Sequence, residues 1–179
     1  AYGDLICDGV DFPVEGKKGR DAVCMGRPET LRFVKDVVDE LKAVFPPGSP
    51  IHLGHDEVSA EAWKKCRYCQ NRLKDLNETD LKALSRDFLQ QIADYVRKDG
   101  YDAIVWDEAG ELEADKHIFV MAWRGNDFAA AAARKGHPVI LAPCSHFYFD
   151  YYQSSAPTEP KAIGGLIPLR QVYGYELPE

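Results

Sequence analysis

The residues best suited to chemistry in this chain are two adjacent carboxylates, Asp56 and Glu57, which follow a short apolar run. The segment 51–58 reads IHLGHDEV, an apolar stretch that closes on a glycine, a histidine and the two acids. The carboxyl end of a buried parallel strand is where α/β proteins place reactive side chains. Two neighbouring carboxylates resist ionising together, so we expect one to keep its proton near neutral pH. A proton donor beside an anion is the equipment of glycoside hydrolysis, although the same dipeptide also occurs at solvated helix starts.

Composition limits the partners of the chain. Its 179 residues suffice for one domain, and 45% hydrophobic with 28% charged residues is typical of a globular protein. The net charge of -7 argues against nucleic acid or an anionic membrane as the partner. No apolar run reaches the roughly 18 residues of a membrane span. The chain shows no signal peptide and opens on Ala1, as a processed or excised chain would.

Apolar runs alternate with helical stripes along the chain. Strands are expected at 51–55, 103–106, 117–123 and 139–142. Helices are expected from Pro28 to Phe45, from a cap at Asp80 to Lys98, and from a cap at Asn126 to Lys135. The first helix should bury one face, made of Leu31, Val34, Val37, Val38, Leu41, Val44 and Phe45. The remaining segments are expected to be a loop over 1–27, a polar excursion with one helical turn over 59–76, and a loop over 154–179.

This alternation predicts βαβ units and a parallel sheet with its polar and aromatic residues at one end. A (β/α)8 barrel needs about 250 residues, so the chain carries the pattern of half a barrel. Four strands leave two open edges, which are an aggregation liability. Pairing of two copies into an eight-stranded assembly is one way to cover them.

The five cysteines leave more than one interpretation open. Cys66 and Cys69 have the spacing of half a zinc site or of a redox pair. Because no second pair at ligand spacing is present, we expect no metal and favour a local disulfide or two free thiols. Cys7 and Cys24 would bridge a loop in an oxidising compartment, and the odd number leaves one thiol unpaired.

Five segments in order resemble glycoside hydrolase family 20, the β-N-acetylhexosaminidases. They are HLGHDEV at 52–58, VWDE at 105–108, MAWRG at 121–125, GHPVI at 136–140 and YFDYYQ at 148–153. The resemblance covers nearly the whole chain. It implies one partial catalytic domain over 1–179, with a TIM barrel fold in which the chain supplies strands four to seven. The loop 1–27 would follow a missing strand, and 154–179 would lead to the missing last strand.

The resemblance also implies a function and a site. The family hydrolyses terminal non-reducing β-linked GlcNAc or GalNAc by a substrate-assisted retaining mechanism, without a cofactor. Glu57 matches the general acid/base, Asp56 the residue that holds the acetamido N–H, and Tyr148 the hydroxyl that orients the acetamido oxygen. Trp106 and Trp123 match the walls of the sugar pocket, and Asp150 matches a polar contact there.

One residue departs from the family signature. His55 stands where the family has its second glycine, which leaves room for close approach of backbone or substrate. The histidine would instead hydrogen-bond a carboxylate or crowd the sugar. The family is often secreted, periplasmic or lysosomal, so a secreted or periplasmic location is expected.

Other interpretations of the same residues remain open. Trp106 and Trp123 would serve equally as core residues, the aromatic segment around Tyr148 as a core strand, and Asp107 with Glu108 as the close of a strand. At the level of function, the alternatives are a catalytically incompetent fragment that binds sugar weakly or acts as a scaffold, and a retaining glycosidase with a carboxylate nucleophile about 5 Å from the acid.

Overall fold

A sheet of four parallel strands in the order β1-β2-β3-β4 forms the centre of the computed structural model, which describes residues 5–7, 23–58, 60–111 and 113–177. The strands are β1 (Pro50–His52), β2 (Asp102–Trp106), β3 (Phe119–Ala122) and β4 (Val139–Leu141). Their register pairs Ile51 with Ala103, Val105 with Val120, and Met121 with Ile140. The sheet order follows the chain order, as in consecutive units of a barrel. The predicted parallel sheet is therefore confirmed, although β1, β3 and β4 are shorter than predicted and β2 begins one residue earlier.

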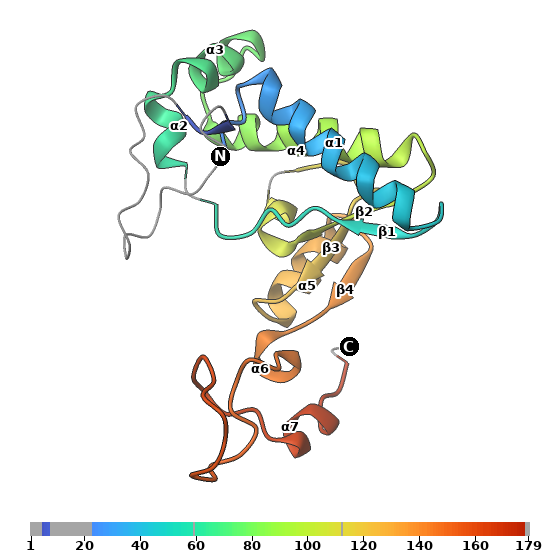
Figure 1. Ribbon diagram of the computed structural model, residues 1–179, viewed down its shortest axis with the longest axis vertical. Coiled ribbons are helices and arrows are strands. Elements are labelled where there is room, and N and C mark those ends of the chain that lie inside the picture. Colours follow the sequence, from blue (N-terminus) through green and yellow to red (C-terminus); the bar gives the residue numbers. More distant parts are fainter. Residues whose placement is uncertain (1–4, 8–22, 59, 112, 178–179) are drawn as a thin grey trace.

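In the described part of the chain, one helix precedes β1, and helices follow each of the four strands. They are α1 (Pro28–Val44), α2 (Glu61–Lys65), α3 (Arg67–Asp75), α4 (Leu81–Arg97), α5 (Asn126–Arg134), α6 (Cys144–Phe147), α7 (Leu169–Tyr173) and the 3₁₀ helix η2 (Asp107–Glu111). The predicted cap of α4 is confirmed, because the Asp80 carboxylate accepts a hydrogen bond from the Lys82 N–H at 2.9 Å. Figure 1 shows α1 and α4 on one side of the strands and α6 with α7 extending beyond β4.

The core lies where α4 packs on β2. Leu84, Leu89 and Val96 on α4 are fully buried, as are Val105 and Val120 of the two central strands. Burying an aliphatic side chain of this size contributes about 1.5–3 kcal/mol relative to leaving it exposed. This core fixes β2 and β3 firmly, so that the residues directly after these strands start from a defined position.

The predicted inner face of α1 is confirmed in part. Val38 is buried and Leu31, Val34 and Leu41 pack against the core, whereas Val37, Val44 and Phe45 are exposed. The reason is that α1 packs on α4, which leaves only a narrow contact stripe on α1. Apolar spacing alone does not tell how wide the covered stripe of a helix is.

Three further expectations are corrected. The polar excursion contains two helices, α2 and α3, and the predicted loop 154–179 contains α7. Asn126 does not cap α5, since its side chain instead accepts a hydrogen bond from the Tyr175 hydroxyl at 2.8 Å. The alternative in which the aromatic segment around Tyr148 forms a core strand is excluded as well, because residues 147–152 form no strand.

Most of the predicted N-terminal loop 1–27 lies outside the described residues. Of its described part, Ile6 forms an antiparallel bridge with Val23, directly before the chain enters α1. Among the described residues, no helix is both long enough and apolar enough to cross a bilayer.

Candidate active site

The backbone carries the first acidic pair out of the sheet at a sharp turn after β1. Pairing with β2 continues beyond the strand, since Leu53 N–H donates to the Ile104 carbonyl at 2.8 Å and Trp106 N–H donates to the Gly54 carbonyl at 2.9 Å. Gly54 has φ of +71°, a conformation that glycine adopts without steric cost. The chain therefore turns away at the carboxyl end of the strand, two residues before Asp56.

His55 occupies the left-handed region in place of the glycine of the signature, with φ of +75°. Its Nε2 lies 2.8 Å from the Ser85 hydroxyl on α4. Of the two alternatives for His55, a bond to a carboxylate is not observed, because the ring turns toward α4 instead. Crowding of the sugar stays a prediction. Burial lowers the pKa of His55, and the negative charge of Asp56 opposes that shift only partly. A neutral imidazole thus joins the signature loop to α4.

Asp56 and Glu57 both carry exposed side chains, and Glu57 also has a positive φ of 48°. Glu57 lines an open hollow of about 410 Å³. Other lining residues come from the signature loop, α2, the start of α4 and η2, among them His55, Trp63, Ser85 and Glu108. The proposed acid is therefore placed beside a space of ligand size.

Trp106 ends β2 beside the signature loop. Its ring lies 4.7 Å from the ring of His52, at an interplanar angle of 56°. His52 in turn accepts a hydrogen bond at Nδ1 from the Gly54 N–H, at 3.0 Å. Trp106 is only partly buried, so part of its ring stays accessible at the carboxyl end of the sheet.

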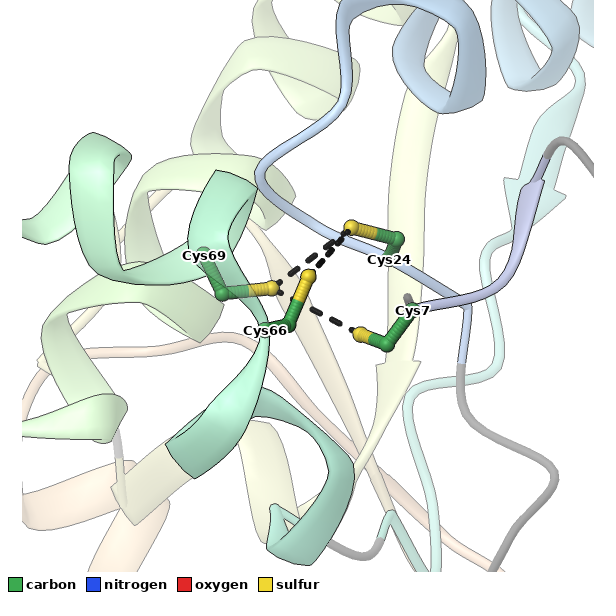
Figure 2. A group of neighbouring side chains, drawn as sticks. All are labelled: Cys7, Cys24, Cys66 and Cys69. Carbon is green, nitrogen blue, oxygen red and sulfur yellow. Dashed lines mark hydrogen bonds between the residues drawn. The ribbon is translucent and has the colours of Figure 1, made fainter. Parts of the chain in front are cut away.

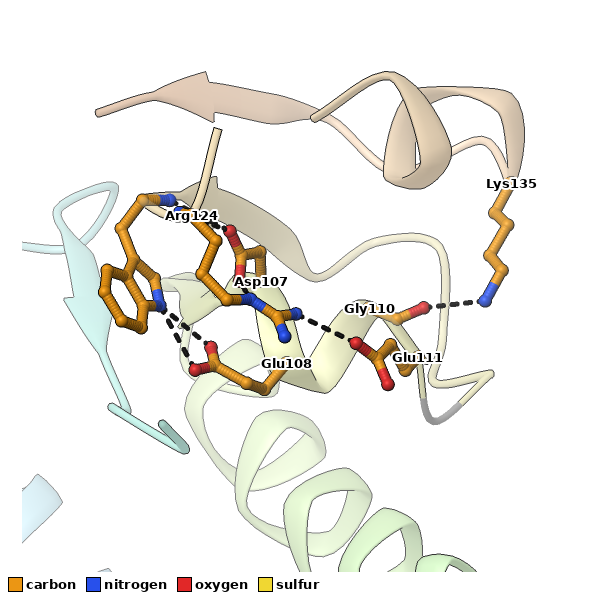
Figure 3. A network of polar contacts seen from close by, with 7 residues as sticks. Asp107, Glu108, Gly110, Glu111, Arg124 and Lys135 are labelled. Carbon is orange, nitrogen blue, oxygen red and sulfur yellow. Dashed lines mark hydrogen bonds and ion pairs between the residues drawn. The ribbon is translucent and has the colours of Figure 1, made fainter. Parts of the chain in front are cut away.

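The Asp107 carboxylate holds the backbone that directly follows β3. It is buried, and its Oδ2 accepts hydrogen bonds from the backbone N–H groups of Trp123 and Arg124, each at 3.0 Å. Its Oδ1 forms an ion pair with the Arg124 guanidinium, which also contacts Glu111 at 2.9 Å. Figure 3 shows this network, in which one carboxylate fixes the backbone that presents Trp123.

Glu108 holds the indole of Trp123, and sequence reasoning missed this role. The indole Nε1 lies 3.2 and 3.0 Å from the two carboxylate oxygens of Glu108. Glu108 also lines the hollow beside Glu57. The two acids after β2 therefore do more than close a strand, because one fixes the backbone of Trp123 and the other its side chain.

Trp123 stacks on Tyr148, which follows α6. Their ring centroids lie 6.3 Å apart with an interplanar angle of 21°. Burial raises the pKa of Tyr148 to about 12, and the negative charges of Asp150, Asp107 and Asp56 act in the same direction. Tyr148 is therefore a protonated hydroxyl at neutral pH.

The structure thus brings the sequence-predicted residues to one end of the sheet. Glu57 and His55 share the hollow, Trp123 and Tyr148 form a stacked pair, and Trp106 borders the signature loop. Asp150 is exposed and acts on Tyr148 through its charge.

Trp63 is a second residue that sequence reasoning did not assign to the site. It is buried at the hollow, and its indole donates a hydrogen bond to the Val23 carbonyl at 3.0 Å. The available signal was one large apolar side chain within a polar segment. That signal indicates burial, but it does not say which surface the residue borders.

Of the two alternatives left open for Cys66 and Cys69, the structure shows free thiols and not a disulfide. All five are free thiols, and four of them, Cys7, Cys24, Cys66 and Cys69, are buried together. Among the described residues, these four are the group of histidine, cysteine and acidic side chains close enough to hold a metal ion. They lie apart from the carboxylates that line the hollow.

Comparisons with known proteins agree on one family. The whole chain, residues 1–179, matches the profile described as glycosyl hydrolase family 20, catalytic domain. The chain is 40% identical over 182 aligned positions to a beta-hexosaminidase of Porphyromonas gingivalis, a match that covers 98% of this chain and 23% of that protein. It is 33% identical to a beta-hexosaminidase of Vibrio furnissii, covering 83% of this chain and 24% of the relative.

Solved structures place the strands in a larger fold. The GH20 exo beta-N-acetylglucosaminidase from Vibrio harveyi in complex with N-acetylglucosamine matches with a TM-score of 0.81 at 30% identity. The match covers 97% of this chain and 28% of that one. The chain therefore spans about a quarter of the length of these relatives, and its four parallel strands correspond to part of a TIM barrel.

Proposed function

Because the chain belongs to the glycosyl hydrolase family 20 catalytic domains, we propose that it supplies the catalytic part of a β-N-acetylhexosaminidase. The substrate would be a glycan with a terminal non-reducing β-linked GlcNAc or GalNAc. One observation carries this proposal: Glu57 and Glu108 line the same hollow, and the Glu108 carboxylate accepts the indole N–H of Trp123, which stacks on Tyr148. A hydroxyl donor, an aromatic wall and two carboxylates thus converge at one end of the sheet.

In the first step, the 2-acetamido oxygen of the sugar attacks the anomeric carbon, and the bond from that carbon to the leaving oxygen breaks. Glu57 gives its proton to the leaving oxygen, so the aglycone departs as a neutral alcohol. The sugar becomes an oxazolinium-type intermediate with its positive charge spread over the acetamido group. No protein carboxylate forms a bond to carbon in this mechanism.

In the second step, water attacks the anomeric carbon from the side that the aglycone left. Glu57, now a carboxylate, takes a proton from this water, and the bond between the anomeric carbon and the acetamido oxygen breaks. The configuration at carbon is retained because two inversions occur. Glu57 ends protonated, ready for another cycle.

Asp56 and Tyr148 would act on the acetamido group itself. The Asp56 carboxylate would accept the acetamido N–H and stabilise the positive charge as it develops. The Tyr148 hydroxyl would donate to the acetamido oxygen and orient it toward the anomeric carbon. Burial favours this role, because it raises the pKa of Tyr148 to about 12 and so keeps the donor proton in place.

Trp106 and Trp123 would form the walls of the pocket. Aromatic faces pack well on the apolar faces of sugar rings and on the acetamido methyl group. The Glu108 carboxylate would keep the Trp123 ring at one angle, since it accepts the indole N–H. Asp150 would add a polar contact at the exposed rim.

The first test is release of p-nitrophenol from its β-N-acetylglucosaminide, measured with the full chain beside Glu57→Gln. We expect the substitution to abolish turnover with little change in fold, since glutamine keeps the shape and removes the acid. The matched control is Glu40→Gln, which makes the same change on the exposed side of α1. Equal activity of Glu57→Gln and the parent chain would rule out the assigned role.

A second pair of reagents separates this mechanism from that of a glycosidase with a carboxylate nucleophile. A thiazoline analogue of the oxazolinium intermediate should inhibit strongly. A fluorosugar that traps covalent intermediates should leave every protein carboxylate unlabelled. Labelling of a carboxylate would favour the nucleophile mechanism, and absence of turnover in residues 1–179 alone would favour a fragment that needs further strands.

The two open edges of the sheet are one reason why residues 1–179 alone would need further strands for turnover. β1 and β4 are the outer strands of the sheet. We propose that further barrel strands, or the strands of a second copy, cover these edges in the working protein. A monomeric mass for residues 1–179 in light scattering would exclude pairing of copies. A secreted or periplasmic location likewise stays a prediction from the family.

A further inference from the structure

Four buried cysteines converge from three separate parts of the chain. Cys7 and Cys24 belong to the two described stretches of the N-terminal segment before α1, residues 5–7 and 23–27. Cys66 directly precedes α3, and Cys69 lies in its first turn. Their side chains point toward one another, as Figure 2 shows. Each is at most 2% exposed, and the four sulfur atoms lie within 4.8 Å of one another.

The sulfur separations fit one small central ion. The closest pairs are Cys24 with Cys66 at 3.5 Å, Cys24 with Cys69 at 3.6 Å, and Cys7 with Cys69 at 3.7 Å. Four thiolates about 2.3 Å from a tetrahedral zinc ion lie about 3.8 Å from one another. A cluster of several irons would hold its ligands farther apart, because the cluster itself stands between them.

The pairing pattern does not favour disulfides. Cys24 approaches two partners almost equally, and Cys69 also approaches Cys7. A pair of disulfides would divide the four sulfurs into two bonded pairs about 2.05 Å apart. The observed arrangement is instead a single group without preferred partners, which is what a shared central ion requires.

The surrounding backbone is shaped to hold thiolates. The Gly26 N–H donates toward the sulfur atoms of both Cys24 and Cys69. A Cβ at Gly26 would overlap with the backbone of Tyr68 and Cys69, so only glycine allows this approach. Donors of this kind orient metal ligands from the next layer of residues.

Charge also fits. A zinc ion with four thiolates carries a net charge of about −2, which a buried position must offset. Arg27 lies over the ring of Tyr68 with its guanidinium carbon 4.1 Å from the ring centre, and Arg67 lies over the same ring at 4.7 Å. Two cations are therefore placed beside the chain segment that joins Cys66 to Cys69.

We propose that Cys7, Cys24, Cys66 and Cys69 form a structural zinc site that joins the N-terminal segment to the start of α3. Zinc binding would release the thiol protons to solvent. The site would fix the position of Cys24 and of its neighbour Val23, whose carbonyl accepts the Trp63 indole N–H at 3.0 Å. The ion would therefore stabilise the position of Trp63, which lines the hollow, and would take no part in the reaction.

The test measures zinc by elemental analysis in the full chain, purified without chelator from a zinc-supplemented culture. We expect about one zinc ion per chain. The double variant Cys66→Ser/Cys69→Ser should lose it, while Cys144→Ser, which removes the thiol outside the cluster, should keep it. Retention of zinc by the double variant, or absence of zinc from the parent chain, would overturn the proposal.

A second measurement needs no variant, in case the double variant does not fold. Cobalt(II) exchanged into the parent chain should give the intense visible bands and thiolate charge-transfer bands of a tetrahedral sulfur site. Thiol reagent should then modify Cys144 while the four ligands react only after chelation. Disulfides in the intact mass, or rapid modification of all five thiols in the metal-supplemented chain, would overturn the proposal whether or not the protein hydrolyses a glycoside.

Discussion

The indole N–H of Trp123 lies within hydrogen-bond distance of both carboxylate oxygens of Glu108, at 3.2 and 3.0 Å. Trp123 comes from the end of β3 and Glu108 from η2, so the contact ties two successive strand ends together. The proposed pocket wall is thus held by a charged acceptor rather than by packing alone. A hydrogen bond of this kind contributes about 1.5–3 kcal/mol.

Glu108→Ala should free the Trp123 ring and lower kcat/KM by about ten- to a hundred-fold. Glu108→Gln keeps one acceptor oxygen and should lose much less. Steady-state kinetics on p-nitrophenyl β-N-acetylglucosaminide check this, with tryptophan fluorescence as a reading of ring order. Glu111→Ala is the matched control, because it removes another carboxylate of the network without touching Trp123. Equal losses in Glu108→Ala and Glu111→Ala would contradict a positioning role for Glu108.

Asp107→Ala should destabilise the fold by about 3–5 kcal/mol, because it removes one partner of a buried ion pair. The side chain of Asp107 is fully buried and that of Arg124 is 25% exposed. The substitution also leaves the backbone N–H groups of Trp123 and Arg124 without their acceptor. Urea unfolding followed by circular dichroism measures the loss, and the exposed Asp36→Ala provides the comparison. A loss below about 1 kcal/mol would show that the pair is not important for stability.

His55→Gly should be more stable than His55→Ala, the reverse of the usual order for these two residues. The reason is the φ of +75°, where a Cβ costs about 1–2 kcal/mol and glycine pays nothing. Both variants lose the contact with Ser85 equally, so their difference isolates the backbone conformation. Thermal unfolding of the two proteins under one condition measures it, and a higher Tm for the alanine variant would refute the assigned strain.

Acid should destabilise the protein through its two histidines near the signature. Burial lowers the pKa of His55 and of His52 below the ordinary histidine value of 6.5, with Asp56 opposing each shift. Because the folded pKa is lower than the unfolded one, the unfolded state takes up protons first as pH falls. The stabilising contribution is therefore complete above about pH 6.5 and is lost as the pH falls toward the folded pKa values. His52 adds a local reason, since its Nδ1 must stay unprotonated to accept the Gly54 N–H.

The check is the free energy of unfolding from neutral pH to pH 5 in the parent chain and in His55→Asn. Asparagine tolerates a positive φ and keeps a polar side chain at this position, but it does not titrate. We expect a shallower fall in the variant, with a remaining slope from His52. Identical slopes would show that His55 has the same pKa in both states.

Sequence patterns predicted the sheet well and the contacts between distant segments poorly. The four apolar runs and the Asp80 cap are local signals, and all became strands or a helix start. α3 was missed because its sequence RYCQNRLKD is mostly polar, and only Cys69 and Leu73 of it are buried. The hydrogen bond between Glu108 and Trp123 joins residues that follow two different strands. The spacing of residues within one segment cannot predict such a contact.

The four cysteines show the same limit. The spacing of Cys66 and Cys69 is that of half a zinc site or of a redox pair, and because no second pair at that spacing follows, the sequence predicts no metal. The other two sulfurs come from Cys7 and Cys24, which the bridge between Ile6 and Val23 brings to the start of α3. A pairing that depends on tertiary structure cannot be deduced from the positions of cysteines alone.

Tyr148→Phe should lower kcat/KM by about a hundred-fold, the usual effect of removing a donor to a developing charge. Phenylalanine keeps the stacking on Trp123 and removes only the hydroxyl. Because the pKa of Tyr148 is raised to about 12, its hydroxyl stays protonated throughout an assay range of about pH 5–9. The variant should therefore lose activity equally at every pH in that range, so the shape of the pH–rate profile should not change. Tyr151→Phe, which alters the neighbouring ring 6.5 Å away, controls for the loss of a hydroxyl. A missing alkaline limb in the Tyr148→Phe profile would mean that the hydroxyl ionises during catalysis, and the donor role proposed for Tyr148 would then be wrong.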